Sequence, residues 1–183
     1  MKIMLTSENN FIETLVDDER KMFRKRFVGM ILATDMAEHM SHMNLIDHRL
    51  KSKGIEMDKK NGRLIIDTDN EMEKHTSQQK VLEFIIHACD LSTPTREFDT
   101  CKQWTYLLFE EFFIQGDVEK SKNLPASFLC DRAKTIVAKE QPGFCNYIVL
   151  PIWNLTQAFL PNMASCYERA VKNTELWKNY EET

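Results

Sequence analysis

Two short histidine motifs contain residue types that could do chemistry. "EHMSHM" places His39 and His42 three residues apart, and "IIHACDLSTP" places His87 three residues before Asp90. Residues at this spacing share one face of a helix, so the imidazole and carboxylate groups of a pair could bind the same metal ion. A metal site needs more ligands than either pair offers. Taken alone, each pair also fits surface residues or hydrogen-bonded core residues.

A third candidate is "EQPGF", where an amide side chain and an aromatic ring stand three residues apart. Gln141 can donate and accept hydrogen bonds at once, which suits the edge of a purine base, and Phe144 offers a face on which a base could stack. The Pro-Gly sequence between them predicts a turn. Taken alone, the pair more often belongs to an ordinary turn beside a core phenylalanine.

Helical spacing of apolar residues predicts the elements that position the first motif. Residues 17–50 are expected to form one long helix that starts at Asp17 and Asp18 and ends before Gly54. Residues 51–76 are polar and predict a surface connection with one short ordered piece at "RLIID". No clear alternating strand pattern is present.

Helical spacing resumes after Thr76 and Ser77, either of which could cap a helix that Pro94 ends. A central helix is predicted over 98–115, with Gly116 as its C-terminal cap. Two further helices, over 129–140 and 144–159, flank the "QPG" turn, and "NMASCYERAVKNTELWKNY" closes the chain as an amphipathic helix. The prediction is an all-α fold in a single domain, 1–183.

The composition excludes several classes of protein. The chain has 183 residues, 43% of them hydrophobic, with only five glycines and five prolines, which suits a compact helical domain and not a disordered or fibrous chain. The net charge of −4 gives no sign of a polyanionic partner. The basic cluster "RKMFRKRF" alternates with apolar positions as a solvated helix face would. Nucleic acid is therefore not the expected partner.

The cysteines and apolar runs indicate where the protein works. Five cysteines are present, an odd number, and no two form a C-x-x-C pair, so neither a disulfide framework nor a zinc ribbon is indicated. Reduced thiols predict a cytoplasmic protein. No apolar run approaches the roughly 20 residues needed to span a membrane, and the first residues lack a signal-peptide stretch.

Five segments follow one another along the chain: "ILATDMAEHMS", "HACDLSTPT", "KQWTYLLFEEFFIQGDVEK", "LPASFLCDR" and "EQPGFCNYIVLPIW". In this order they resemble the C-terminal half of the catalytic domain of class I cyclic nucleotide phosphodiesterases, which supports a functional interpretation of the motifs above more strongly than each motif does alone. The resemblance extends from about residue 11 to "NTELWKNY". It implies an all-helical, HD-type, metal-dependent phosphohydrolase that hydrolyses cyclic AMP, cyclic GMP or both to 5'-monophosphates.

The resemblance also implies roles for individual residues. Asp90 matches a ligand of the tightly bound metal ion, usually zinc, beside which the family binds a second ion, magnesium. Gln141 matches the glutamine that binds the purine, and Phe144 matches the phenylalanine that stacks on it. His39 and His42 fall outside the metal site. Four residues match the rest of the pocket around the opposing apolar wall at Leu108, namely Phe109, Phe112, Leu129 and Met36.

Two departures from the family pattern leave the nucleotide preference open. Thr93 stands where members selective for cyclic AMP often have asparagine, and Phe109 stands where many have methionine. A larger departure is that the family's H-N-x-x-H and H-D motifs, which supply its general-acid histidine and its other metal ligands, do not occur in this chain. The reversed pair at Asp47 and His48 lies downstream of the expected place.

Three interpretations follow. The first is part of a phosphodiesterase that works through two metal ions in its full-length context, with residues 1–183 alone inactive and with uncovered apolar faces that favour self-association. The second is a catalytically inactive helical module that binds a nucleotide or a partner without a metal centre. The third is a metal site formed by His39, His42, His87 and Asp90 without phosphodiesterase chemistry.

Overall fold

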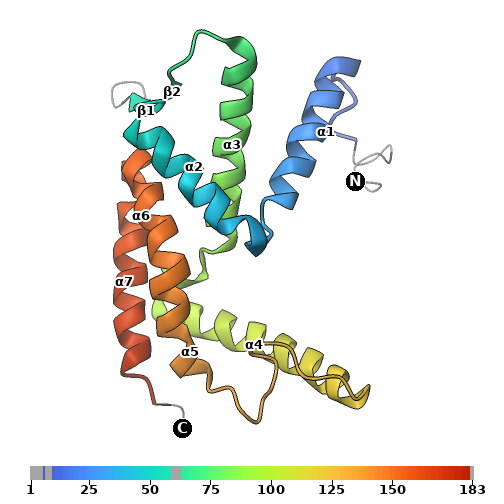
Figure 1. Ribbon diagram of the computed structural model, residues 1–183, viewed down its shortest axis with the longest axis vertical. Helices are drawn as coiled ribbons and strands as arrows, with labels where there is room; N and C mark the ends of the chain where they lie inside the picture. The colour runs from blue at the N-terminus through green and yellow to red at the C-terminus, as the bar shows by residue number, and fades with distance from the viewer. Residues whose placement is uncertain (1–5, 7–9, 59–62, 182–183) are drawn as a thin grey trace.

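The computed structural model describes Thr6 and residues 10–58 and 63–181, and helices make up most of it. Helices α2, α3, α6 and α7 form a bundle, α4 crosses one end of that bundle, and α1 packs on α3 at one side (Figure 1). This arrangement confirms the predicted all-α class. The helices are α1 (Asp17–Leu32), α2 (His39–Lys51), α3 (Glu71–Asp90), α4 (Phe98–Ser121), α5 (Val137–Phe144), α6 (Leu150–Phe159) and α7 (Ala164–Lys178), with the short 3₁₀ segments η2 (Met36–Glu38), η3 (Thr93–Thr95) and η5 (Pro161–Met163) and the π-helical segment η4 (Cys145–Val149).

The prediction of one helix over 17–50 is wrong, because α1 ends at Leu32 and α2 begins only at His39. The Thr34 hydroxyl donates a hydrogen bond to the carbonyl of Ile31 at 2.8 Å, and the Asp35 carboxylate accepts one from the backbone N–H of Ala37 at 2.9 Å. Short polar side chains that bond the nearby backbone in this way compete with the helical ladder. The His39-x-x-His42 pair therefore lies on a helix of its own.

Residues 51–76 contain a β-hairpin that the sequence pattern did not predict. Strand β1 (Ile55–Asp58) pairs with β2 (Arg63–Ile66) in antiparallel register, with Ile55 opposite Ile66. The predicted ordered piece at "RLIID" is confirmed as β2. The side chain of Ile55 is buried against the bundle, so the hairpin closes one end of the core.

Helix α3 begins earlier than predicted. Asn70 caps it, with its side-chain oxygen accepting hydrogen bonds from the N–H groups of Met72 and Glu73 at 3.0 and 3.2 Å. The caps predicted at Thr76 and Ser77 are therefore wrong. The helix ends at Asp90, before the break that Pro94 predicts.

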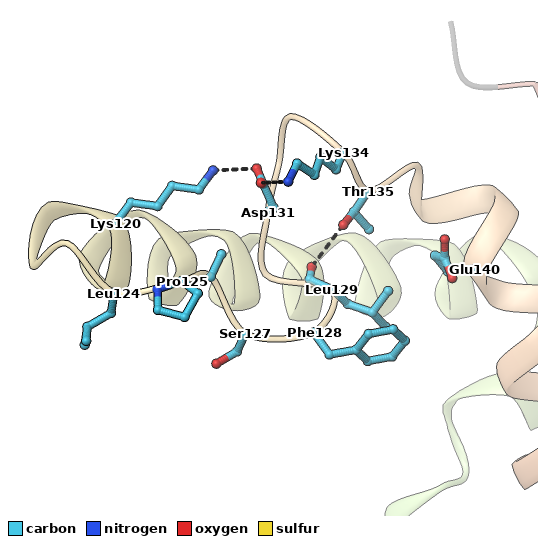
Figure 2. Close-up of a pocket in the computed structure, with 11 residues that line it drawn as sticks. Lys120, Leu124, Pro125, Ser127, Phe128, Leu129, Asp131, Lys134, Thr135 and Glu140 are labelled. Carbon is cyan, nitrogen blue, oxygen red and sulfur yellow. Dashed lines mark hydrogen bonds and ion pairs between the residues drawn. The ribbon is translucent and has the colours of Figure 1, made fainter.

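Helix α4 continues past Gly116, so the predicted cap there is wrong. The left-handed residue after the end of the helix is Asn123, with φ of 58°. Gly116 is buried inside the helix, where a glycine costs about 1 kcal/mol relative to alanine. A Cβ at Gly116 would lie 2.7 Å from the carbonyl carbon of Cys130 and closer still to its oxygen. The glycine thus lets the connection 122–136 lie directly on α4 (Figure 2).

Gly116→Ala is expected to lower the free energy of unfolding by about 1–3 kcal/mol, although alanine favours a helix. The main chain of Cys130 can give way only if the whole connection shifts. Urea unfolding followed by circular dichroism measures the change. Gly143→Ala is the matched control, because Gly143 is also inside a helix but has nothing within 4 Å of a new Cβ. Equal effects at the two glycines would contradict this account.

The predicted helix over 129–140 is displaced to α5, and the predicted "QPG" turn is absent, whereas the helix predicted over 144–159 is confirmed, as η4 followed by α6. Residues 129–136 are not helical, and Pro142 and Gly143 lie inside α5. The chain then continues as η4 into α6, where Pro151 stands near the first turn. Prolines lack the N–H that an α-helical ladder needs, so a π-helical segment between two of them is a reasonable local solution.

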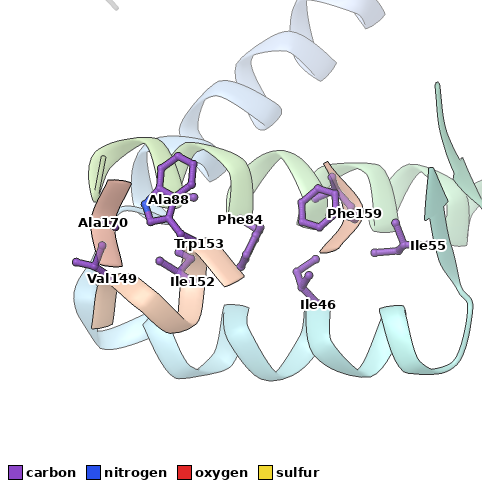
Figure 3. Close-up of a cluster of buried hydrophobic side chains, with 10 residues drawn as sticks. Ile46, Ile55, Phe84, Ala88, Val149, Ile152, Trp153, Phe159 and Ala170 are labelled. Carbon is purple, nitrogen blue, oxygen red and sulfur yellow. The ribbon is translucent and has the colours of Figure 1, made fainter. Parts of the chain in front are cut away.

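The main core lies between the helices of the bundle (Figure 3). A smaller second cluster joins α4 and α5 to α7, where Cys101 and Ala138 pack around Trp177. The bundle therefore supports the end of α3 and positions α4 and α5. The main core consists of Ile46, Ile55, Val81, Phe84, Ala88, Val149, Ile152, Trp153, Phe159 and Ala170.

Candidate functional site

Gln141 and Phe144, the predicted base-binding pair, share one face of α5. Their spacing of three residues on a helix places the two side chains one above the other. Gln141 is buried, with 5% of its surface exposed, whereas Phe144 is 38% exposed. A helix in place of the expected turn therefore keeps the amide and the ring together, with the ring open to solvent.

The predicted residues of α4 divide between surface and interior. Leu108 is 47% exposed and Phe112 is half-buried, so both contribute to the helix surface. Phe109 is buried, and its ring centroid lies 5.6 Å from that of Phe112 and 5.9 Å from that of Phe113. Phe109 thus supports the predicted wall from beneath.

Leu129 lies in the connection 122–136 and lines a cavity of about 530 Å³ (Figure 2). Its φ is 64°, in the left-handed region that a leucine rarely adopts, at a cost of roughly 1–2 kcal/mol. The same cavity is lined by Phe128 from the connection and by Glu140, which precedes Gln141 in α5. Leu129 is one of the residues that the resemblance assigns to the base pocket, but the other predicted pocket residues, Gln141 and Phe144 among them, are not part of the lining of this cavity.

Asp90, the predicted metal ligand, is the exposed last residue of α3, and Met36 is 45% exposed in η2. Within the described ranges, no group of three or more His, Cys, Asp or Glu side chains is placed to hold a metal ion. Asp90 is therefore the one predicted metal ligand among the described residues, and a single carboxylate does not by itself fit a centre of two metal ions.

Three buried histidines meet where α2 packs on α3. His39 Nδ1 and His87 Nε2 are 2.9 Å apart and share a hydrogen bond, and the ring centroid of His42 lies 5.6 Å from that of His87. Their exposed fractions are 3%, 0% and 6% for His39, His87 and His42. Burial lowers the pKa of all three, with positive charge on the neighbouring histidines lowering those of His39 and His87 further. The interpretation as hydrogen-bonded core residues therefore describes His39 and His87, whereas His42 is buried with no hydrogen-bond partner for its Nε2.

Carboxylates near the three histidines tend to raise the pKa of His42 and His87, but this effect is smaller than the lowering caused by burial. Glu83 tends to raise the pKa of His42 and Asp90 that of His87, while Lys80 lowers that of His42. The larger effect of burial keeps the three imidazoles neutral at neutral pH. The cluster is thus a structural contact between two helices.

A network of polar contacts between α4 and the connection was missed from the sequence. Glu119 accepts hydrogen bonds from the Ser127 N–H at 2.6 Å and from the Ser127 hydroxyl at 2.7 Å. Lys120 pairs with Asp131 at 2.5 Å, and Arg132 pairs with Asp117 at 2.8 Å. The signal in the sequence was Gly116, a glycine inside an otherwise strongly helical segment.

Helices α1 and α4 each leave several apolar side chains exposed to solvent. No residue of α1 is buried. On α4, residues at helical spacing form one exposed apolar stripe, and α1 and α4 project to the same side of the bundle (Figure 1). The stripe consists of Trp104, Leu107, Leu108, Ile114 and Val118.

All five cysteines are free. Among the described helices, none combines the length and the apolar character that crossing a membrane requires.

Comparison with known sequences connects residues 1–170 to the family described as 3'5'-cyclic nucleotide phosphodiesterase. A 3',5'-cyclic-AMP phosphodiesterase of Drosophila melanogaster, isoform F, is 36% identical over 135 residues, which are 74% of this chain and 19% of the fly protein. A probable 3',5'-cyclic-AMP phosphodiesterase of Caenorhabditis elegans is 31% identical over 179 residues, 97% of this chain and 25% of the worm protein. The chain thus spans a quarter or less of these two relatives.

Solved structures of phosphodiesterases are also similar to this chain over part of their length. The phosphodiesterase domain of Salpingoeca rosetta rhodopsin phosphodiesterase superposes with a TM-score of 0.82 at 27% sequence identity, over 97% of this chain and 50% of that domain. LmjPDEB1 in complex with IBMX gives a TM-score of 0.81 at 25% identity, over 97% of this chain and 49% of that one. The described fold corresponds to about half of each solved domain.

Proposed function

Because the chain belongs to the 3',5'-cyclic nucleotide phosphodiesterase family, we propose that it forms the base-binding half of a catalytic domain that hydrolyses cyclic AMP, cyclic GMP or both to 5'-monophosphates. The observation that carries the proposal is the pairing of Gln141 with Phe144 on one face of α5, in a chain that matches the family over residues 1–170. Hydrolysis belongs to the full-length context, since the chain covers half of the solved domains.

The proposed division of work follows from the chemistry of each side chain. Gln141 orients the base by donating and accepting hydrogen bonds at its edge, and Phe144 stacks on its face. Leu108 and Phe112 of α4, with Leu129, exclude water from the other face. Met36 completes the pocket from η2.

A pair of divalent metal ions, zinc and magnesium, is part of the proposed reaction, and Asp90 is the residue of this chain proposed to bind one of them. Metal ions in such centres polarise the phosphate and activate water. The remaining ligands and the general-acid histidine are proposed to come from the other half of the domain. The unpaired cysteines favour a reducing, cytoplasmic setting for the whole protein.

Phe144→Ala is expected to weaken the binding of cyclic AMP and cyclic GMP by about 1–3 kcal/mol, because a stacked base is lost. Two-dimensional NMR spectra of the isotope-labelled chain, recorded as each nucleotide is added, measure the affinity. The method covers the millimolar dissociation constants expected of half a site. Phe11→Ala is the control, since Phe11 is an exposed ring outside the proposed pocket. Equal affinity in the Phe144 variant and the unsubstituted protein would count against the stack.

Gln141→Ala is expected to weaken the binding of both nucleotides, by on the order of 1–3 kcal/mol, since the polar edge of the base would lose its partner in a buried place. The same titration measures it. A loss confined to one nucleotide would show that Gln141 selects between bases instead of orienting either. An unchanged affinity for both would remove Gln141 from the site.

Self-association of the chain follows from the apolar stripe on α4, which we propose the other half of the domain covers. Sedimentation velocity at micromolar concentration is expected to give a mass above the 21.5 kDa of one chain. Leu107→Lys combined with Ile114→Lys should restore the mass of one chain, because both residues belong to the stripe. Met72→Lys, at a residue 79% exposed on α3, should not. A single-chain mass for the unsubstituted protein would refute the expectation.

A further inference from the structure

Leu129 is held in a strained conformation by contacts on both sides of it. Two residues before it, the N–H and hydroxyl of Ser127 both donate to the Glu119 carboxylate, at 2.6 and 2.7 Å. Two residues after it, Asp131 pairs with Lys120 at 2.5 Å. Glu119 and Lys120 are neighbours on α4, so one turn of that helix fixes both flanks of Leu129. Figure 2 shows the pair of Lys120 with Asp131.

Further contacts keep the connection close to α4. Cys130, the residue after Leu129, lies against Gly116, where no side chain could be accommodated. Arg132 pairs with Asp117 at 2.8 Å and lies over the ring of Phe113 at 5.3 Å from the ring centroid. The left-handed conformation of Leu129, φ 64°, is sustained because these surroundings determine it from several directions.

Within this network, the Glu119 carboxylate accepts two hydrogen bonds from a single residue of the connection, Ser127. It also accepts a hydrogen bond from Gln115 at 2.9 Å, so both its oxygens are engaged. The hydrogen bonds from Ser127, first of all the one from its hydroxyl, and the one from Gln115 lower the pKa of Glu119. The group is therefore ionised at neutral pH and accepts charge-assisted hydrogen bonds.

We propose that Glu119 is a positioning residue for nucleotide binding, which acts by holding Ser127 so that the strained Leu129 faces the base. This inference rests on the proposed function, because it takes Leu129 as part of the base pocket. Strain of this kind clusters at functional sites, and Leu129 lines a cavity together with Glu140, the residue that precedes Gln141 in α5. Glu119 itself touches no substrate in this proposal.

NMR of the full chain tests the proposal through two signals at once. In Glu119→Ala, the Ser127 amide is expected to exchange with solvent about tenfold faster or more, and the dissociation constants of cyclic AMP and cyclic GMP are expected to rise about fivefold to tenfold. The thermal midpoint should move by no more than about 2 °C, because the network lies at the surface. The matched control is Glu175→Ala, which removes an exposed carboxylate of α7 that pairs with Lys178.

A double-mutant cycle separates positioning from a general loss of structure. Ser127→Ala removes the hydroxyl bond and keeps the amide bond, so its effect on nucleotide affinity should be smaller than that of Glu119→Ala. The double variant should be no worse than Glu119→Ala alone, because both substitutions break one contact. Fully additive losses of affinity would overturn the proposal.

Two other outcomes are decisive. Faster exchange at Ser127 with unchanged nucleotide affinity in Glu119→Ala, while Phe144→Ala still weakens binding, would refute the positioning role and leave the proposed function standing. Absence of nucleotide binding by the unsubstituted chain at millimolar concentration would overturn the proposed function, and the positioning role with it.

Discussion

Purified residues 1–183 are expected to show no hydrolysis of cyclic AMP or cyclic GMP, even with zinc and magnesium added. The described residues bring one predicted metal ligand, Asp90, and no cluster of three or more ligands. A single exposed carboxylate competes poorly with the water shell of a divalent ion. Turnover is measured by separating the cyclic and linear nucleotides after long incubation.

Asp90→Ala is the control for this expectation. Turnover by the unsubstituted chain that disappears in the variant would show that other ligands complete the site, and our account would then be wrong. Turnover that persists in the variant would indicate a contaminating enzyme. A fusion of residues 1–183 to an upstream segment that carries the H-N-x-x-H and H-D motifs is expected to hydrolyse cyclic nucleotides, and Asp90→Ala should abolish that activity. If the chain is instead a catalytically inactive helical module, the fusion would stay inactive.

Acid is expected to destabilise the fold steeply below about pH 6.5, because His39, His42 and His87 are buried in a neutral form. Their pKa values are lowered in the folded state, so the unfolded chain binds more protons as the pH falls through the ordinary histidine value. The stability that they contribute is complete above that value and is lost as the pH falls toward the folded-state values. Each histidine can reduce the free energy of unfolding by at most about 1.4 kcal/mol per pH unit.

Urea unfolding at a series of pH values between 8 and about 5 measures this dependence. His42→Leu should flatten the slope and keep the stability near pH 8, since His42 Nε2 is buried without a hydrogen-bond partner. His75→Gln should leave the slope unchanged, because His75 is exposed. A slope in His42→Leu as steep as in the unsubstituted protein would show that other groups cause the acid unfolding.

The helices that could be predicted are those with a long, regular apolar face. The segment that ends at Asp90, the central helix from Phe98 and the closing helix all follow from helical spacing. The break at Thr34 and Asp35 depends on side chains that bond their own backbone, which apolar spacing does not register. The role of Gly116 depends on Cys130, a contact between residues apart in sequence.

The candidate site was predicted chiefly from the resemblance to the family. The local sequence around each motif favoured a structural interpretation, as surface residues, core residues or an ordinary turn. Gln141 and Phe144 would have shared no helix face in the expected turn, and the structure places them on one. Phe109 illustrates what spacing could not show, because it is buried while its neighbour Leu108 is 47% exposed. Which face of α4 is covered depends on segments distant in sequence, as the contact of Cys130 with Gly116 illustrates. The assignment of Asp90 to a metal ion stays a prediction.

Trp177 has a consequence for the size of the molecule that this pocket could accept. Its indole packs between Cys101 of α4 and Ala138 of α5, the two helices that carry the proposed walls of the base pocket. The distance between those walls is therefore set partly by the thickness of one side chain from the last helix. A smaller residue at this position is expected to let α4 and α5 approach each other, which would narrow the proposed base pocket without changing any residue that lines it.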